Sequence, residues 1–177
     1  MKALTIIQPW ATLLAAGKKR IETRSWKTNY RGEILIHAGG MKYNYFLDVC
    51  QSRKELIPYF RDAGIGSDAD LQALPFKAIV GKAVLVNCVQ IDALTAELIR
   101  KQHPEEYAFG NFAPGRYAWV MEDAVLFKKP VPASGKQGLW NWEPVFEKYA
   151  NVGKDETFLY SVAKYEEIME ARYGHKD

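Results

Sequence analysis

The sequence predicts an α+β fold in a single domain. Two long stretches, 76–91 and 117–127, are rich in the β-branched and aromatic residues that strands favour, and stretches with helical spacing lie around them. A chain of 177 residues is long enough to build one full hydrophobic core. The contents of 48% hydrophobic and 25% charged residues are typical of globular domains.

The first predicted elements are a short apolar strand at Ala3–Ile7 and a helix from Gln8 to Gly17. Pro9 lies in the first helical turn, where proline is favourable, and Gly17 supplies the C-terminal stop. The inner face of this helix is expected to carry three apolar residues, namely Trp10, Leu13 and Leu14.

The next part of the chain alternates between strand and helix patterns. Arg20–Arg24 and Gly32–Ala38 are predicted to be strands. Apolar residues at helical spacing predict an amphipathic helix over Tyr43–Ala63. The polar stretch Gly64–Pro75 has little pattern and is expected to be a loop.

Phe76–Ile91 is the strongest strand candidate, because valines recur along it, and Gly81 is expected to mark a bend. A helix is predicted over Ala93–Lys101 and stops before Pro104.

The second long strand is predicted over Tyr117–Phe127, where Pro130 and Pro132 terminate it. A long polar helix with one apolar stripe is expected over Asp155–Tyr173. The sequence contains no internal repeat, linker or low-complexity tract, so one domain accounts for the pattern.

Positive charge is concentrated between Lys18 and Arg31, where six of the 14 residues are Lys or Arg and only Glu22 is acidic. The period of two in a strand places Arg20, Glu22 and Arg24 on one face. A lone carboxylate among cations indicates a site for a polar, anionic ligand. The net charge of +3 is too small to establish a nucleic-acid partner, so the clustering carries the inference.

Several classes of protein do not fit the sequence. Cys50 and Cys88 supply neither a disulfide framework nor the ligand pairs of a zinc site, and we expect no metal and no cofactor. We find no P-loop and no nucleophile–base–orienter triad. Because no apolar run has transmembrane length and the N-terminus lacks a signal-peptide core, we expect a cytoplasmic protein with reduced thiols and no membrane partner.

Several separated motifs stand out along the chain. The first is the stretch QPWATLLAAGKKRIETRSWKTNYRGEILIHA, which holds a Gln-Pro-Trp-Ala opening and a GxKxxExR segment. That segment consists of Gly17, Lys19, Glu22 and Arg24. The later stretches are AIVGKAVLVNCVQI, FGNFAPGRYAWVMEDAVLF and GKQGLWNW. These motifs and their order resemble the activating signal cointegrator homology (ASCH) domain family, and the resemblance covers about residues 1–145.

The resemblance implies a PUA-like fold, a small β-barrel of five or six strands with flanking helices. The helix from Gln8 to Gly17 would close one side, and the strands Arg20–Arg24 and Phe76–Ile91 are expected to pair. The GxKxxExR segment would form the floor of a cleft beside the barrel. Residues 146–177 are then expected to be a C-terminal helical extension packed on the same domain, 1–145.

Three residues of the GxKxxExR segment are the leading site candidates. Lys19 could hold a phosphate as a point charge, or act as a base if desolvated. Glu22 could accept hydrogen bonds from base amino groups, act as a catalytic carboxylate, or form a structural ion pair with Arg24. Arg24 could hold a phosphate or a base edge through two parallel hydrogen bonds.

Three further cations are candidate ligand contacts, each with a plain structural alternative. Arg31 could bind the ligand or only occupy a strand edge. Arg116 follows a Pro-Gly turn and is expected at the mouth of the cleft, and Lys136 lies in a Gly-rich polar loop whose backbone N–H groups could meet a phosphate. His37 ends an apolar strand and fits a satisfied core histidine better than a catalytic one.

The function expected first is the binding of RNA or a modified nucleotide or nucleoside in a cationic cleft with aromatic walls. The alternative is a nucleoside or RNA hydrolase, either acetylcytidine amidohydrolase-like or a ribonuclease, with Lys19 and Glu22 as general acid and base. The family's amidohydrolases have Thr where this chain has Glu22, so their nucleophile is missing here. A second alternative, suggested by the family's name alone, is a protein-interaction adaptor in transcription. An open groove would favour a strand of RNA, and a closed pocket would favour a nucleoside.

Overall fold

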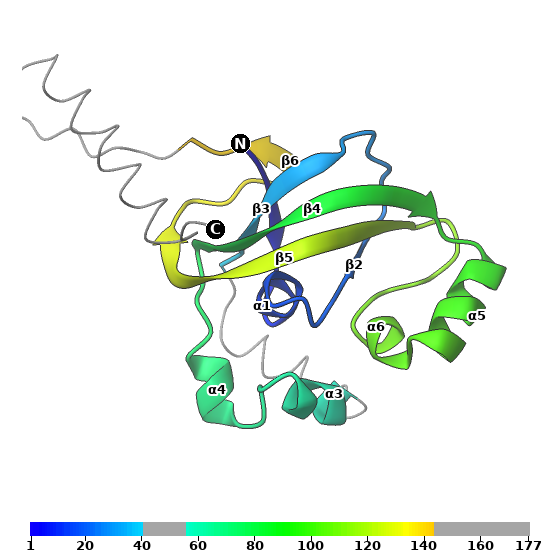
Figure 1. Ribbon diagram of the computed structural model, residues 1–177, viewed down its shortest axis with the longest axis horizontal. Coiled ribbons are helices and arrows are strands. Elements are labelled where there is room, and N and C mark those ends of the chain that lie inside the picture. Colours follow the sequence, from blue (N-terminus) through cyan, green and yellow to red (C-terminus); the bar gives the residue numbers. More distant parts are fainter. Residues whose placement is uncertain (41–55, 144–177) are drawn as a thin grey trace, which may run out of the picture. The chain divides into compact units, whose positions relative to one another are not determined.

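A curled sheet of six strands forms the framework of the domain (Figure 1). The structure is a computed structural model, and it describes residues 1–40 and 56–143. Met1–Asn141 forms one compact unit and Trp142–Asp177 a second. The predicted extension 146–177 and its helix at Asp155–Tyr173 lie outside the described residues.

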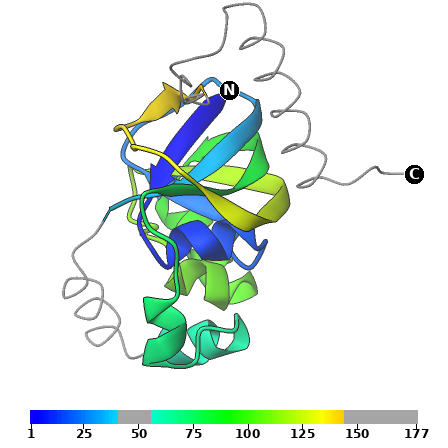
Figure 2. The ribbon, with the colours of Figure 1, turned by 90° about the vertical axis from the view of Figure 1, so that its left-hand side faces the viewer.

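The order of strands in the sheet is β2-β5-β4-β3-β1-β6. The strands are β1 (Lys2–Ile6), β2 (Ile21–Arg24), β3 (Gly32–Ala38), β4 (Ala78–Gln90), β5 (Tyr117–Pro132) and β6 (Leu139–Asn141). β1 and β3 run parallel, and every other neighbouring pair is antiparallel. Because β2 and β6 remain edges, the sheet is a half-open barrel (Figure 2). The predicted α+β fold with a small barrel-like sheet is therefore confirmed, with six strands.

The partner of β2 differs from the prediction. β2 pairs with the first part of β5, where Glu22 lies opposite Trp119. The predicted pairing with 76–91 is wrong, because β3 and β5 occupy the two edges of β4. The outer edge of β5 is the free one, and β2 takes it.

The predicted bend at Gly81 is a register shift between β4 and β5. A Cβ atom at this position would lie 2.7 Å from the Cβ of Ala15 and would also collide with the carbonyl oxygen of Val125. Glycine is therefore required here, because the helix α1 (Trp10–Ala15) and β5 both approach the β4 backbone.

The end of β5 also differs from the prediction. The strand continues through Pro130 to Pro132, which pairs with Ala78 of β4. Proline was expected to end the strand because it lacks an N–H donor. The missing N–H donors of Pro130 and Pro132 are tolerated because β2 pairs only with the first four residues of β5. The outer edge of β5 beyond them has no partner strand and needs no donor.

Helix α1 fills the concave side of the sheet, where it lies against β3, β4 and β5 (Figure 1). Its predicted inner residues are all buried, namely Trp10, Leu13 and Leu14. The side-chain oxygen of Gln8 accepts a hydrogen bond from the Thr12 N–H at 3.1 Å, which satisfies a donor of the first turn. Gly17 has a φ of 70° after the helix, as its predicted role as a stop requires.

The other described helices are short, apart from α5. They are α3 (Ile57–Asp62), α4 (Asp68–Gln72), α5 (Ala93–Gln102) and α6 (Pro104–Ala108). The helix predicted over 93–101 is confirmed as α5, and of the helix predicted over 43–63 only residues 56–63 are described. The loop predicted over 64–75 is wrong, because Ser67 and Asp70 form a capping box that starts α4. Figures 1 and 2 place α3 and α4 on the same side of the sheet as α1.

Candidate nucleotide-binding cleft

The carboxylate of Glu22 lies between two cations of the same segment. Its Oε2 is 3.3 Å from Lys19 Nζ, and its Oε1 is 3.2 Å from Arg24 Nε. Glu22 keeps 12% of its exposure, whereas Lys19 keeps only 1%. The ion pair with Arg24 that the sequence left open is therefore formed, a second pair with Lys19 accompanies it, and Glu22 is fixed in one position.

Lys19 is buried because of the way in which the chain leaves α1. After Gly17, the N–H of Lys19 donates to the Leu13 carbonyl at 3.1 Å, which turns the side chain beneath β2. There its ammonium group also donates to the carbonyl oxygen of Ile21. A buried ammonium is costly unless it is paired, so Glu22 is a necessary partner.

A further carboxylate, that of the buried Glu106 of α6, holds the start of β2. It accepts hydrogen bonds from the backbone N–H groups of Arg20 and of Ile21, the latter at 3.1 Å. Burial raises the pKa of Glu106 above its ordinary value, and the charge of Lys19 acts in the opposite direction. Sequence reasoning missed this residue, because only the fold brings a short helix from position 104 onward to the segment at position 20.

Arg24 connects β2 to β1 across the open side of the barrel. Its Nη2 donates to the carbonyl oxygen of Thr5 at 2.7 Å. β2 and β1 are not neighbours in the sheet, so this hydrogen bond joins two strands that pair with other partners. Arg24 therefore fixes the width of the gap between them.

A cleft of about 290 Å³, called here the β1–β2 cleft, occupies this gap. Its lining comes from the end of β1, the start of α1, β2 and the segment after α6: Thr5, Ile6, Ile7, Trp10, Glu22, Thr23, Arg24, Phe109, Gly110 and Asn111. Trp10 and Phe109 give it aromatic walls, and Glu22 and Arg24 give it charged groups. Among the described residues, no acceptor faces the indole N–H of Trp10.

The predicted site residues do not all line the β1–β2 cleft. Lys19 lies beneath it and acts on it through Glu22. Arg116 lies behind its wall and donates to the carbonyl oxygens of Thr23, at 3.2 Å, and Asn111, at 3.1 Å. The backbone oxygen of Lys136 accepts from Thr5 Oγ1 at 2.8 Å, which brings its loop next to the cleft.

Arg31 lies outside the cleft, at the start of β3. Its guanidinium donates to the carbonyl oxygens of Thr28 and Tyr30 at 3.2 and 2.8 Å. The role of Arg31 in binding, like that of the other site residues, stays a prediction.

His37 is a core residue, as its apolar strand predicted, but its ring is only half satisfied, because no described group hydrogen-bonds to the buried Nδ1. Its side chain is buried, and Nε2 lies 3.0 Å from the carbonyl oxygen of Ala133. The imidazole ring packs edge-on against Trp140, with centroids 5.7 Å apart. The side chain therefore supports the 133–138 loop rather than the cleft.

The half-open barrel and the GxKxxExR segment on its cleft define the class of this protein. The chain belongs to the ASCH domain family, whose profile matches residues 4–169. It is 26% identical over 151 residues to Activating signal cointegrator 1 of Mus musculus and of Homo sapiens, a match that covers 85% of this chain. The chain spans about a quarter of the length of these relatives, with 24% of each covered. A crystal structure of ASCH from Zymomonas mobilis aligns with a TM-score of 0.47 at 16% identity, over 91% of this chain and 94% of that one.

No helix in the described ranges 1–40 and 56–143 is long and apolar enough to cross a membrane. Within the same ranges, no group of three His, Cys, Asp or Glu side chains could hold a metal ion.

Proposed function

We propose that this domain binds RNA or a modified nucleotide, with one base in the β1–β2 cleft. The observation that supports this most is the fixed carboxylate of Glu22 at the cleft surface. A carboxylate held in one place by two cations can accept a hydrogen bond from an exocyclic amino group, as carboxylates do from cytosine. Trp10 and Phe109, which are 8% and 4% exposed, add apolar surface to the wall of the cleft that the base would contact.

The size and charge of the cleft suit a single base. Ligand pockets commonly measure roughly 300–1,000 Å³, and the cleft, with about 290 Å³, lies just below that range. Arg24 is the cation that lines the cleft, because Lys19 is buried near the carboxylates of Glu22 and Glu106. The guanidinium of Arg24 can attract an anionic phosphate outside the cleft.

A hydrolase is the weaker candidate, because the cleft lacks an activated nucleophile among its described residues. Thr5 Oγ1 donates to the Lys136 carbonyl oxygen and accepts from the indole N–H of Trp140 at 3.1 Å. Thr23 Oγ1 accepts from the Asn111 N–H at 3.0 Å. Neither the Thr5 nor the Thr23 hydroxyl donates to a side chain that could act as a general base. Lys19 is too buried to reach a substrate as a general acid or base, which leaves Glu22 alone.

A transcription adaptor remains an alternative only through the name of the relatives, Activating signal cointegrator 1. The match covers only 24% of the length of those relatives, so their role need not lie in this part of them. The cleft itself gives no support to that role.

A salt titration with a short single-stranded RNA tests the proposed function. If phosphate contacts contribute, the logarithm of the binding constant falls with the logarithm of salt concentration, at a slope of roughly −0.7 per neutralised phosphate. Cytidine and N4-acetylcytidine are incubated in parallel, and their products are followed. A flat salt dependence, or no binding at low salt, contradicts RNA binding, and clean turnover of either nucleoside favours the hydrolase.

A further inference from the structure

A second and larger groove adjoins the β1–β2 cleft at the α5–α6 end of the domain. It measures about 770 Å³, and its lining includes Tyr59, Arg100, Tyr107 and Phe112. We call it the α6 groove. Gly110 and Asn111 line both the α6 groove and the β1–β2 cleft, so these two residues form a common wall. A ligand that leaves the cleft over this wall enters the groove.

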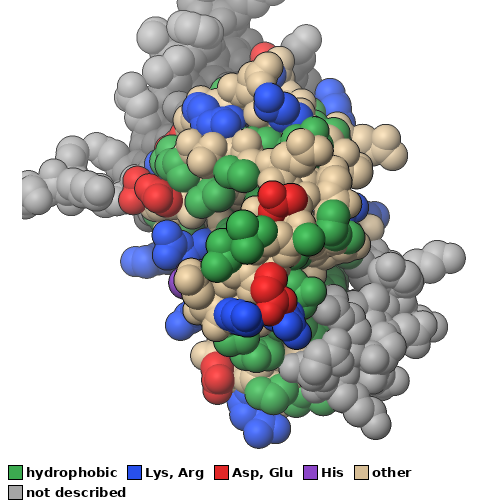
Figure 3. Space-filling view, turned by 90° about the vertical axis from the view of Figure 1, so that its right-hand side faces the viewer, with side chains coloured by type: hydrophobic (Ala, Val, Ile, Leu, Met, Phe, Trp, Pro, Cys, Tyr) green, Lys and Arg blue, Asp and Glu red, His purple; other side chains and the backbone are tan. Residues whose placement is uncertain are grey.

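The α6 groove presents aromatic rings. Tyr107 and Phe112 stack with centroids 5.5 Å apart and planes 15° apart, and Tyr107 remains 37% exposed. Tyr59 of the groove also contacts Phe109 of the cleft, with ring centroids 6.0 Å apart. Figure 3, which faces this end of the domain, shows hydrophobic side chains beside Lys, Arg and acidic ones. A base has a π-face that can stack on such rings whatever its identity.

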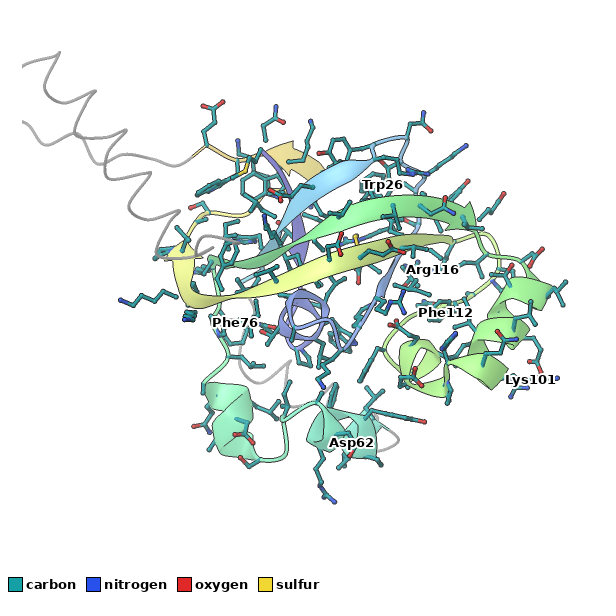
Figure 4. The ribbon with its side chains drawn as sticks, in the orientation of Figure 1. Trp26, Asp62, Phe76, Lys101, Phe112 and Arg116 are labelled. Carbon is teal, nitrogen blue, oxygen red and sulfur yellow. The ribbon has the colours of Figure 1, made fainter. Side chains whose placement is uncertain are left out.

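The common wall between the two sites is closely packed, and the guanidinium of Arg116 lies behind it. A Cβ atom at Gly110 would lie 2.5 Å from the ring of Phe112, so a side chain there would displace that ring. Arg116 donates only to backbone carbonyls, and no described carboxylate pairs with it, whereas Arg100 is paired with Glu97 at 2.8 Å. Figure 4 shows Arg116 and Phe112 together near the start of β5. Arg116 lines neither the cleft nor the groove, so its charge acts on their boundary from behind Asn111.

We propose that the α6 groove is a second base-binding site, so that the ligand is single-stranded RNA of at least two nucleotides. One base occupies the β1–β2 cleft, the phosphate crosses the wall at Gly110 and Asn111 near Arg116, and the next base stacks on Tyr107. This inference rests on the proposed function for its first base. It selects a strand over a free nucleoside, because a nucleoside leaves the larger groove and the charge of Arg116 unused.

The test compares two probes, cytidine 5′-monophosphate and an oligocytidine tetranucleotide, in binding measurements on the full chain. We expect the tetranucleotide to bind more tightly than the monophosphate. Tyr107→Ala is expected to weaken tetranucleotide binding by roughly 5- to 150-fold, the usual range for one stacked base, and to leave the monophosphate unchanged. Tyr107→Phe keeps the ring and should keep the affinity.

Leu94→Ala is the matched control, because Leu94 lies on α5, is 67% exposed and does not line the α6 groove. Equal tetranucleotide affinity for Tyr107→Ala and wild type would overturn the second site while the first stands. Equal affinity of the wild type for the two probes would also overturn the second base-binding site. A protein partner would then be the remaining candidate ligand of the α6 groove. If neither probe binds, the proposed function itself fails. Thermal unfolding of each variant shows whether a loss of binding reflects a loss of folding.

Discussion

The ammonium of Lys19 lies 3.3 Å from the carboxylate of Glu22 although the lysine side chain is almost fully buried. This pair links the interior of the domain to the surface of the β1–β2 cleft, because Glu22 lines the cleft and Lys19 does not. Glu22, which would contact a ligand, is therefore held in place by Lys19, which would not. Substitutions in the pair are expected to change stability as well as binding, and the two effects must be measured separately.

Glu22→Ala is expected to destabilise the domain strongly. It leaves the buried ammonium of Lys19 with only the carbonyl oxygen of Ile21 and the field of Glu106, and removing one partner of a buried pair typically costs about 3–5 kcal/mol. Urea denaturation measures the loss. Glu33→Ala is the control, because its pair with Lys82 is exposed and is expected to contribute only about 0–1 kcal/mol. Equal losses in the two variants would show that the Lys19 pair is screened like a surface one.

Glu22→Gln separates a binder from a hydrolase. In a binder, the substitution removes a negative charge near the RNA phosphates and keeps an acceptor oxygen, so affinity should be equal or tighter. In a hydrolase, it removes the proton acceptor, and turnover should fall by roughly 10²–10⁴-fold. RNA binding and product formation are measured on the same folded sample. A marked loss of affinity without any turnover in wild type would contradict both expectations.

Glu106 gives the stability of the domain a specific dependence on pH. Its pKa is raised by burial above the ordinary value of 4.5, so the folded state binds more protons than the unfolded state between 4.5 and the raised value. Stability from this group is therefore present at low pH and is lost as the pH rises through that window. Glu106→Gln should remove this decrease, which denaturation curves collected at several pH values would reveal.

The control for Glu106 is its exposed neighbour. Glu105→Gln should leave most of the decrease in place, because burial is the main cause of the raised pKa of Glu106 and the charge of Glu105, on the surface near His103, adds a smaller increase. The carboxyl groups of Asp70 and Asp92 have lowered pKa values, since Ser67 and Thr95 respectively hydrogen-bond to them, and their effect falls below pH 3.8. The two windows are thus separate, and a decrease that survives in Glu106→Gln would assign it to another group.

Local sequence predicted the parts of the fold that depend on neighbouring residues. β3 has the predicted bounds, Gly32–Ala38, and Gly17 ends α1 as expected, because alternation and glycine conformation are local properties. The partner of β2 was missed, since pairing depends on which sheet edge is free once all strands are placed. α4 was missed although its capping box, Ser67 and Asp70, is legible in the sequence.

The candidate site divides in the same way. Lys19, Glu22 and Arg24 are close in sequence, and the structure brings their charged groups together. The spacing could not reveal that Lys19 would be buried, because its burial follows from the turn after α1. Glu106 and the aromatic α6 groove arise from long-range packing of short helices, for which the sequence holds no periodic pattern.

The two arginines outside the cleft lining should differ in their contribution to RNA binding. Neither arginine lines the cleft or the groove, but Arg116 donates to the carbonyl oxygen of Asn111 in their common wall, whereas Arg31 lies at the start of β3. Arg116→Gln should therefore reduce the steepness of the salt dependence by roughly 0.7, the value of one phosphate contact on a single strand. Arg116→Lys keeps the charge and should keep the slope, although it weakens the hydrogen bonds to Thr23 and Asn111. Arg31→Gln should leave the slope of wild type unchanged; a reduction equal to that of Arg116→Gln would move the bound strand to the β3 side of the sheet.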